Sequence, residues 1–178
     1  NNSATAGITL TLQPLGSGRI TNVVTVRSDL ADFRAVNDLA SVASTVVDPG
    51  VFLNLENIIL ADAAPSLPHP VVINVSGLAG VVSKVTATIV ELSHTFPADL
   101  DVLLVGPAGQ KVMLMSDAGA GNAVNGISLR FDDDAAITLS QIGQLFSGSF
   151  RPTDYEPDDV LFAPAPAGPY ATVLSAFR

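Results

Sequence analysis

The sequence predicts an all-β protein built as a β-sandwich, and three observations point to this class. Apolar residues come in short runs separated by Gly, Pro, Asn and Asp, which is the spacing of short strands joined by turns. Val, Ile and Thr are abundant, whereas strong helix formers other than Ala and Leu are scarce. Several segments alternate apolar and polar residues, as strands with one buried face do.

Three strands are expected in the first part of the chain, at residues 6–12, 18–26 and 40–47. Alternation is cleanest in 20–26 and 41–47, which predicts one buried and one solvated face for these two strands. We expect residues 1–48 to form one unit, and residues 49–69 to form a linker with a first short strand at 57–62.

The remaining residues, 70–178, are expected to form the main sandwich. The apolar runs 100–105 and 112–115 flank Gly106-Pro107-Ala108-Gly109, a tight-turn sequence, so this stretch predicts a β-hairpin. The tail after Arg151, rich in Pro and Asp, predicts an ordered loop over the sandwich. The strands expected in this part are 71–75, 83–92, 100–105, 111–115, 126–131 and 144–150.

Composition narrows the function classes. The chain has 178 residues, with 17 acidic against 8 basic side chains and a net charge of −9, so it repels nucleic-acid phosphates. No apolar run approaches the roughly 18 residues of a membrane-spanning helix. Cysteine is absent, which excludes disulfides, thiolate catalysis and zinc–cysteine sites. Nucleic acid is therefore not an expected partner, and no membrane-spanning helix is expected.

Enzymatic activity is not expected from this sequence. The only histidines are His69 and His94, and no Gly-x-Ser-x-Gly motif presents a nucleophile. Asp99 and Asp101 stand two apart on an expected strand and so share a face, but the chain has no Trp and 2 Tyr for a sugar-cleaving cleft. We expect Asp99 to cap the turn after Phe96-Pro97.

Calcium is the expected cofactor, if any. The carboxylates at strand ends or in loops that could supply hard oxygen ligands are Asp117, Asp132, Asp133 and Asp134. A bound cation would relieve the mutual repulsion of the three consecutive aspartates. The alternative is a solvated acidic loop without a metal, because no EF-hand spacing is present.

The stretch LSHTFPADLDVLLVGPAGQKVMLMSDAG, residues 92–119, resembles the P-domain (P/Homo B) of subtilisin-like proprotein convertases, in the form found in large secreted bacterial proteins. The resemblance extends to 70–80 and 155–170. It implies a jelly-roll, galactose-binding-like sandwich, a secreted or cell-surface location and, for some members, calcium. It also implies a structural hydrogen bond for His94.

Residues 18–47 resemble the C-terminal half of a DUF11-type Ig-like repeat, a module of bacterial surface proteins. This half-repeat predicts either a partial Ig-like unit or strands available for donation to a neighbour. The P-domain resemblance also implies two further strands after those present here, so completion of the sandwich is expected, either by a neighbouring chain or by another segment of the parent protein.

Three functions remain open. The first is a non-catalytic β-sandwich module of a secreted or cell-surface bacterial protein, with a structural or binding role and possible calcium stabilisation. The second is a self-assembling extracellular fibre subunit, whose partners are other copies or other segments of the parent protein, joined through strand edges. The third is a protease-associated P-domain that stabilises a subtilisin-like catalytic domain.

Overall fold

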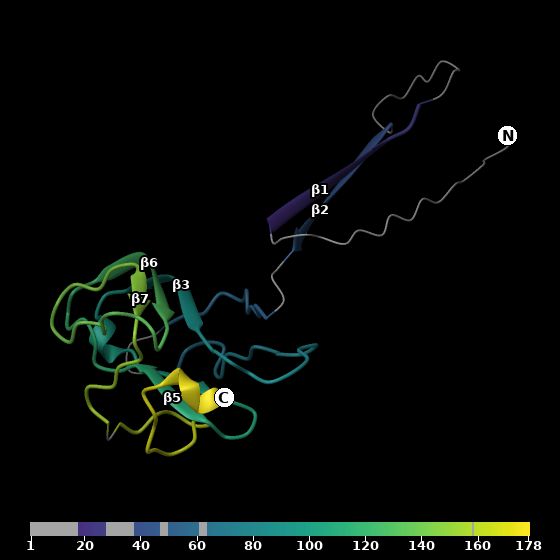
Figure 1. Ribbon diagram of the computed structural model, residues 1–178. Coiled ribbons are helices and arrows are strands. Elements are labelled where there is room, and N and C mark those ends of the chain that lie inside the picture. The colour runs from purple at the N-terminus through teal and green to yellow at the C-terminus, as the bar shows by residue number, and fades with distance from the viewer. Residues whose placement is uncertain (1–17, 28–37, 47–49, 61–63, 158) are drawn as a thin grey trace. The chain divides into compact units, whose positions relative to one another are not determined.

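The computed structural model describes residues 18–27, 38–46, 50–60, 64–157 and 159–178 (Figure 1). These residues form strands with almost no helix, so the predicted all-β class is confirmed. Contacts divide the chain into two compact units, Asn1–Leu53 with Ile73–Leu78, and Asn54–Val72 with Ala79–Arg178. The predicted strand at 6–12 lies outside the described residues.

The first unit contains an antiparallel hairpin of β1 (Gly18–Thr25) and β2 (Leu39–Val46). The register pairs Asn22 with Val42, which puts Val42 on the same face as Val24. Alternation predicts that this face is buried, yet Val24 is 44% and Val42 61% exposed. The hairpin therefore carries an apolar face open to solvent.

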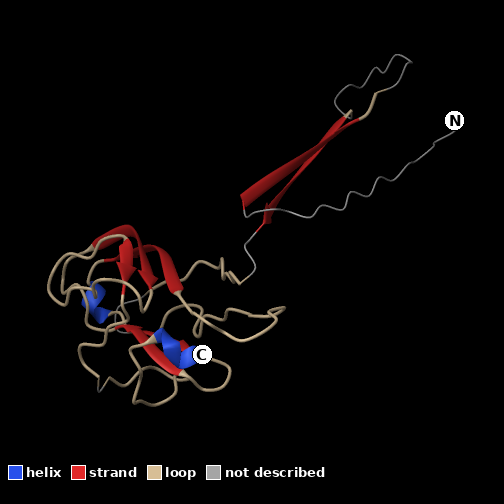
Figure 2. Cartoon of the chain, in the orientation of Figure 1, coloured by secondary structure: helices blue, strands red, loops and turns tan. Residues whose placement is uncertain are grey.

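The second unit contains two sheets (Figures 1 and 2). In the larger sheet, β6 (Val124–Phe131) lies between β3 (Ala87–His94), which is antiparallel to it, and β7 (Gly148–Phe150), which is parallel to it. The smaller sheet is the hairpin of β4 (Val102–Val105) and β5 (Lys111–Met115). The predicted β-hairpin around 106–109 is therefore present.

The turn of this hairpin shows why the sequence needs glycine here. Gly109 has φ +86°, a conformation that side chains with a Cβ rarely adopt, and its N–H donates to Gly106 O at 3.0 Å. Gly106 N–H donates to Gln110 O at 2.9 Å, which closes the loop between the strands.

Helical structure in the described residues consists of two 3-10 turns, η2 (Pro97–Asp99) and η3 (Leu174–Phe177), shown in blue in Figure 2. Among the described residues, no helix is long and apolar enough to cross a membrane.

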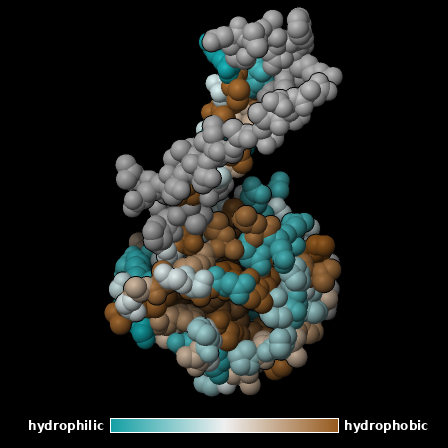
Figure 3. Space-filling view, turned by 90° about the vertical axis from the view of Figure 1, so that its right-hand side faces the viewer, coloured by the Kyte–Doolittle hydropathy of each residue, from teal (hydrophilic) through white to brown (hydrophobic). Residues whose placement is uncertain are grey.

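Both sheets of the second unit contribute to a single core. Val112 and Leu114 come from β5, whereas Leu129 and Phe131 come from β6, and all four are at most 4% exposed. Leu174 of η3 joins the same cluster, so the C-terminal turn packs into the core. Apolar side chains also remain on the surface of this unit, where Figure 3 shows them among polar ones.

Two β-bulges interrupt the ladder between β3 and β6. Ser93 alone stands opposite Asn125 and Gly126, because the flanking pairs are Leu92–Ile127 and His94–Val124. Three residues earlier on β3, Val90 and Glu91 stand opposite Ser128 alone. The extra residue lies on β3 in one bulge and on β6 in the other, so the two shifts cancel and the register is the same on either side of the pair.

A backbone N–H at each bulge meets the hydroxyl of the single opposing serine. Gly126 N–H donates to Ser93 Oγ at 2.9 Å, and Glu91 N–H donates to Ser128 Oγ at 3.5 Å. Gly126 has φ +64° and Glu91 has φ +58°, so each bulge contains one residue in the left-handed region.

Some predicted strands are shorter or absent. Residues 71–75 belong to no strand, and Ile73 and Val75 are 47% and 61% exposed. Their apolar pattern predicts a strand, but they pair with none of the described strands. The strand predicted at 57–62 is reduced to one bridge between Ile59 and Leu67. β7 begins at Gly148 rather than at 144.

Candidate metal centre

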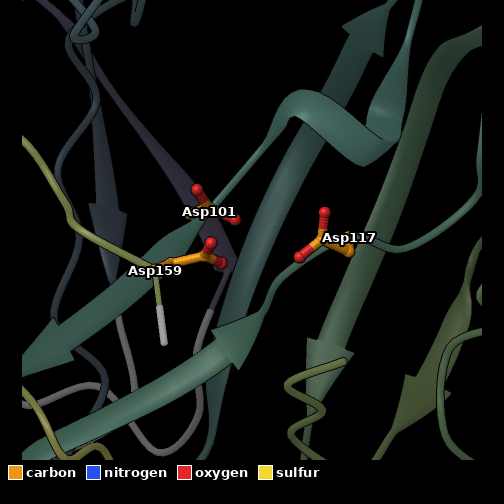
Figure 4. Close-up of side chains that lie close together, drawn as sticks. All are labelled: Asp101, Asp117 and Asp159. Atoms are coloured by element: carbon orange, nitrogen blue, oxygen red, sulfur yellow. The ribbon is translucent and has the colours of Figure 1, made fainter. Parts of the chain in front are cut away.

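Three carboxylates meet in the second unit. Asp101, Asp117 and Asp159 each offer one oxygen, and these oxygens lie within 4.8 Å of one another (Figure 4). Asp101 is exposed as a residue and the other two are half-buried. We call this group the acidic cluster. Its members come from three separate segments of the chain.

The β4–β5 hairpin brings Asp101 and Asp117 together. Asp101 directly precedes β4, and Asp117 follows β5 after one residue. Because Val102 pairs with Met115, the start of β4 lies beside the end of β5. The antiparallel ladder thus brings two carboxylates, distant in sequence, to one end of the sheet.

The C-terminal tail supplies Asp159. Thr153 N–H donates to Leu114 O at 3.1 Å, and Ser116 N–H donates to Thr153 O at 3.2 Å, so the tail runs beside the end of β5. Asp159 N–H then donates to Glu156 O at 3.3 Å. This turn returns Asp159 towards Asp117.

Ser116 lies at the centre of the cluster. It is fully buried, and its Oγ is 2.8 Å from both Asp117 Oδ2 and Asp159 Oδ2. A hydroxyl has one proton, so it donates to only one of the two carboxylates at a time. The serine therefore holds the two side chains in place without neutralising their charge.

The electrostatics of the cluster disfavour a full set of negative charges. The carboxyl of Asp101 is half-buried although the residue is exposed, and this desolvation is the main cause that raises its pKa to about 6. The charges of Asp159, Asp117 and Asp154 raise that pKa further, while a hydrogen bond from Ser116 opposes the shift. A cation at this position would relieve the repulsion.

The donor set fits calcium. Carboxylates are hard oxygen ligands, and Ca²⁺ accepts irregular arrangements of about six to eight oxygens, including backbone carbonyls and water. Asp117 has φ +50°, a left-handed conformation that Asp tolerates better than most residues. The backbone at this position is thus bent at the point where β5 ends and its side chain joins the cluster.

The predicted ligands Asp132, Asp133 and Asp134 do not join Asp117, and they form no close carboxylate group of their own among the described residues. Lys84 Nζ lies 2.7 Å from Asp132 Oδ1 and 2.6 Å from Asp134 Oδ2. Lys84 is the main cause that lowers the pKa of Asp132, and Arg130 adds to it. Asp133 instead accepts two backbone hydrogen bonds from η3.

The other predicted site residues have local roles. His94 Nδ1 accepts a hydrogen bond from Phe96 N–H at 3.2 Å and lies 2.9 Å from Phe96 O. Asp99 is in η2 rather than on a strand with Asp101, and its backbone N–H, not its carboxylate, closes the turn onto Phe96 O. The shared strand face predicted for Asp99 and Asp101 is therefore wrong, because the chain turns between them.

Two shallow recesses open on the second unit. One, of about 430 Å³, is lined by Tyr155, Glu156, Pro157 and Asp159 and so adjoins the acidic cluster. The other, of about 520 Å³, includes Ile137, Phe146 and Phe150 in its lining. The first contains more charge, since two of its four residues are acidic.

Asp101 and Asp159 were not among the predicted ligands. A signal for Asp101 exists in the sequence, because Asp101 stands near the start of the predicted hairpin and Asp117 just after its end. Asp159 had no comparable signal, because its position depends on the path of the tail beside β5.

The fold and site together define an all-β protein with an acidic cluster that joins a hairpin to a C-terminal tail. No protein-family model, curated protein or solved structure matches the chain. The resemblance to P-domains and to DUF11-type repeats therefore stays a prediction from the sequence.

Proposed function

We propose that the chain is a non-catalytic β-sandwich module of a secreted or cell-surface protein, stabilised by calcium at the acidic cluster. One observation carries the calcium proposal: oxygens of Asp101, Asp117 and Asp159 lie within 4.8 Å of one another, from three separate segments. An ion here would tie the tail to the β4–β5 hairpin. That is a structural role.

Calcium suits this position better than magnesium. Mg²⁺ demands near-ideal octahedral geometry at about 2.0–2.1 Å, whereas Ca²⁺ accepts longer and less regular contacts. Ser116 restrains Asp117 and Asp159, while Asp101, which also has a hydrogen bond from Ser116, is the most exposed of the three. Backbone carbonyls and water would complete the coordination. The resemblance to P-domains supports the same ion and a jelly-roll arrangement of the strands.

A structural rather than catalytic role agrees with the chemistry nearby. The acidic cluster contains carboxylates and one serine, without a histidine to activate that serine. His94 contacts backbone groups of Phe96. A purified chain that hydrolyses peptides or glycosides, with activity lost on mutation of Asp101 or His94, would contradict this part of the proposal.

The calcium proposal is tested by thermal unfolding in EDTA, in millimolar Ca²⁺ and in millimolar Mg²⁺. Binding to the folded state alone adds about 2.7 kcal/mol at a ligand concentration one hundred times Kd. The melting temperature should rise in Ca²⁺, and much less in Mg²⁺. An equal melting temperature in EDTA and in Ca²⁺ contradicts the proposal.

A double variant, Asp101→Asn with Asp159→Asn, should lose the response to calcium. Asp99→Asn is the matched control, because Asp99 is exposed and lies two residues from Asp101 but outside the acidic cluster. The control should respond to calcium as the unmodified chain does.

One observation favours the second candidate, a self-assembling fibre subunit. The β1–β2 hairpin is a two-stranded sheet with exposed valines on both faces, among them Val23 at 56% and Val42 at 61%. Such a hairpin is marginally stable alone, and its edges and faces are suited to pairing with another chain. Light scattering and electron microscopy of the purified chain test this, and a monodisperse monomer at high concentration contradicts it.

A further inference from the structure

The bulge between β3 and β6 places an Asn-Gly dipeptide against a serine hydroxyl. Gly126 N–H donates to Ser93 Oγ at 2.9 Å, and Ser93 Oγ–H donates to Asn125 Oδ1 at 3.2 Å. A single hydroxyl therefore contacts both the backbone nitrogen of Gly126 and the side-chain carbonyl of Asn125. All three residues are exposed, so water reaches them.

These two groups are the ones that react when asparagine loses its amide. The backbone nitrogen of the next residue attacks the side-chain carbonyl carbon, and glycine at that position hinders the attack least. Asn125-Gly126 is the only Asn-Gly dipeptide in the sequence. Apart from its two chain neighbours, no atom lies within 4 Å of the position that a Cβ of Gly126 would occupy, so this side of the glycine is uncrowded.

We propose that Asn125 is a self-modification site, at which Ser93 assists conversion of the asparagine to aspartate and isoaspartate. As the bond from Gly126 N to Asn125 Cγ forms, the Gly126 N–H proton passes to Ser93 Oγ, and the Ser93 hydroxyl proton passes to Asn125 Oδ1. This produces a neutral tetrahedral intermediate. A relay that both removes and supplies a proton is a form of general acid–base catalysis.

The intermediate then collapses to a succinimide. The bond from Cγ to the side-chain nitrogen breaks, the Oδ1 proton moves to that nitrogen, and ammonia leaves. Water then opens the ring at either carbonyl, which gives aspartate or isoaspartate. Water is the one co-reactant, and no oxidant or metal takes part, so this inference is independent of the calcium proposal.

The product changes the surface beside the bulge. A neutral amide becomes a carboxylate on a chain whose net charge is already −9. Isoaspartate also adds a backbone methylene to β6 between the pairs Leu92–Ile127 and His94–Val124. The modification would therefore loosen the ladder at the point where the register is restored.

The first test compares the folded and unfolded states of one chain. The purified protein is incubated at neutral pH, once in buffer and once in urea, and peptide mass mapping follows aspartate and isoaspartate at Asn125. Faster conversion in the folded state supports the proposal, since urea removes the contact with Ser93. Slower conversion in the folded state overturns it, because the strand would then protect the asparagine.

The second test changes the hydroxyl. Ser93→Ala should slow conversion in the folded state by about tenfold or more, and Ser93→Thr, which keeps a hydroxyl, should retain most of the rate. In urea all three chains should react alike, which controls for the sequence. Wild-type rates in folded Ser93→Ala overturn the proposal. If Ser93→Ala fails to fold, the threonine variant and the folded-against-urea comparison decide.

Discussion

Asp133 caps η3, forty-one residues further along the chain. Its Oδ1 accepts a hydrogen bond from Leu174 N–H at 2.7 Å, and its Oδ2 accepts one from Ser175 N–H at 2.8 Å. Both oxygens of one carboxylate thus satisfy the first free N–H groups of a helical turn. Leu174, held in this way, is 1% exposed and belongs to the core.

Asp133→Ala should destabilise the protein by about 1–2 kcal/mol, because two backbone N–H groups lose a charged acceptor. Urea denaturation monitored by circular dichroism measures this. Asp99→Ala is the control, since Asp99 makes no side-chain cap, and it should change stability by less than about 0.5 kcal/mol. Equal effects of the two substitutions would show that the cap contributes nothing.

Without calcium, the contribution of Asp101 to stability should fall as pH rises from 3.8 to about 6. The pKa of Asp101 is about 6 in the folded chain and 3.8 in the reference state, so the folded chain holds more protons in this window. Ionisation of Asp101 therefore costs stability, and the cost is complete above about pH 6. Melting temperatures measured in EDTA across this range test the direction, and Asp101→Asn should flatten the profile.

Calcium should bind more tightly as pH rises through the same window. A ligating carboxylate must be deprotonated, so binding to the acidic cluster competes with the proton on Asp101. Calcium titration by calorimetry at two pH values, one on each side of about 6, measures the affinity and the released proton. Equal affinity at both values, with no proton release, would place the ion elsewhere.

Glu91→Gly should stabilise the fold by about 1 kcal/mol. Glu91 is exposed and has φ +58°, a conformation that costs a residue with a Cβ but not glycine. Glu91→Ala removes the same charge and keeps the Cβ, so it should not give this gain. The two variants are compared by denaturant midpoint.

Leu129→Ala should cost about 2–5 kcal/mol, because Leu129 is 0% exposed and its loss leaves a cavity between the two sheets. Val90→Ala, at a position 68% exposed on the paired strand, should stay within about 0.5 kcal/mol. A similar loss at both positions would mean that the core described here is wrongly placed.

The sequence predicts local elements better than their partners. The hairpin around Gly106 and Gly109 was predictable because its turn residues and flanking apolar runs lie within a short stretch. The parallel pairing of β7 with β6 was not, because alternation shows which residues form a strand and not which strand lies beside it. The prediction of a strand at 71–75 was wrong for the same reason: its apolar pattern is that of a strand, but it pairs with no described strand.

The residues of the candidate site also differ in how far the sequence predicts them. Asp117 was predictable as a carboxylate at the end of a strand, and it joins the acidic cluster. The Asp132–Asp134 run attracted the calcium prediction through its charge density. In the structure Lys84 pairs with Asp132 and Asp134, and backbone N–H groups of η3 donate to Asp133. Both partners are about forty residues or more away in the sequence. Neither partner can be inferred without the folded tail and the segment before β3.

Each bulge lets two residues share one outward position, so the core face stays in phase along both strands. On β3, Ile89 and Leu92 are three residues apart, yet both pack in the core, while Val90 and Glu91 between them are exposed. Val124 and Ile127 of β6 enclose the exposed residues 125 and 126 in the same way. Deleting one residue from either bulge would therefore leave the core side chains on their present face, whereas a deletion elsewhere in β3 or β6 would turn all later side chains of that strand over.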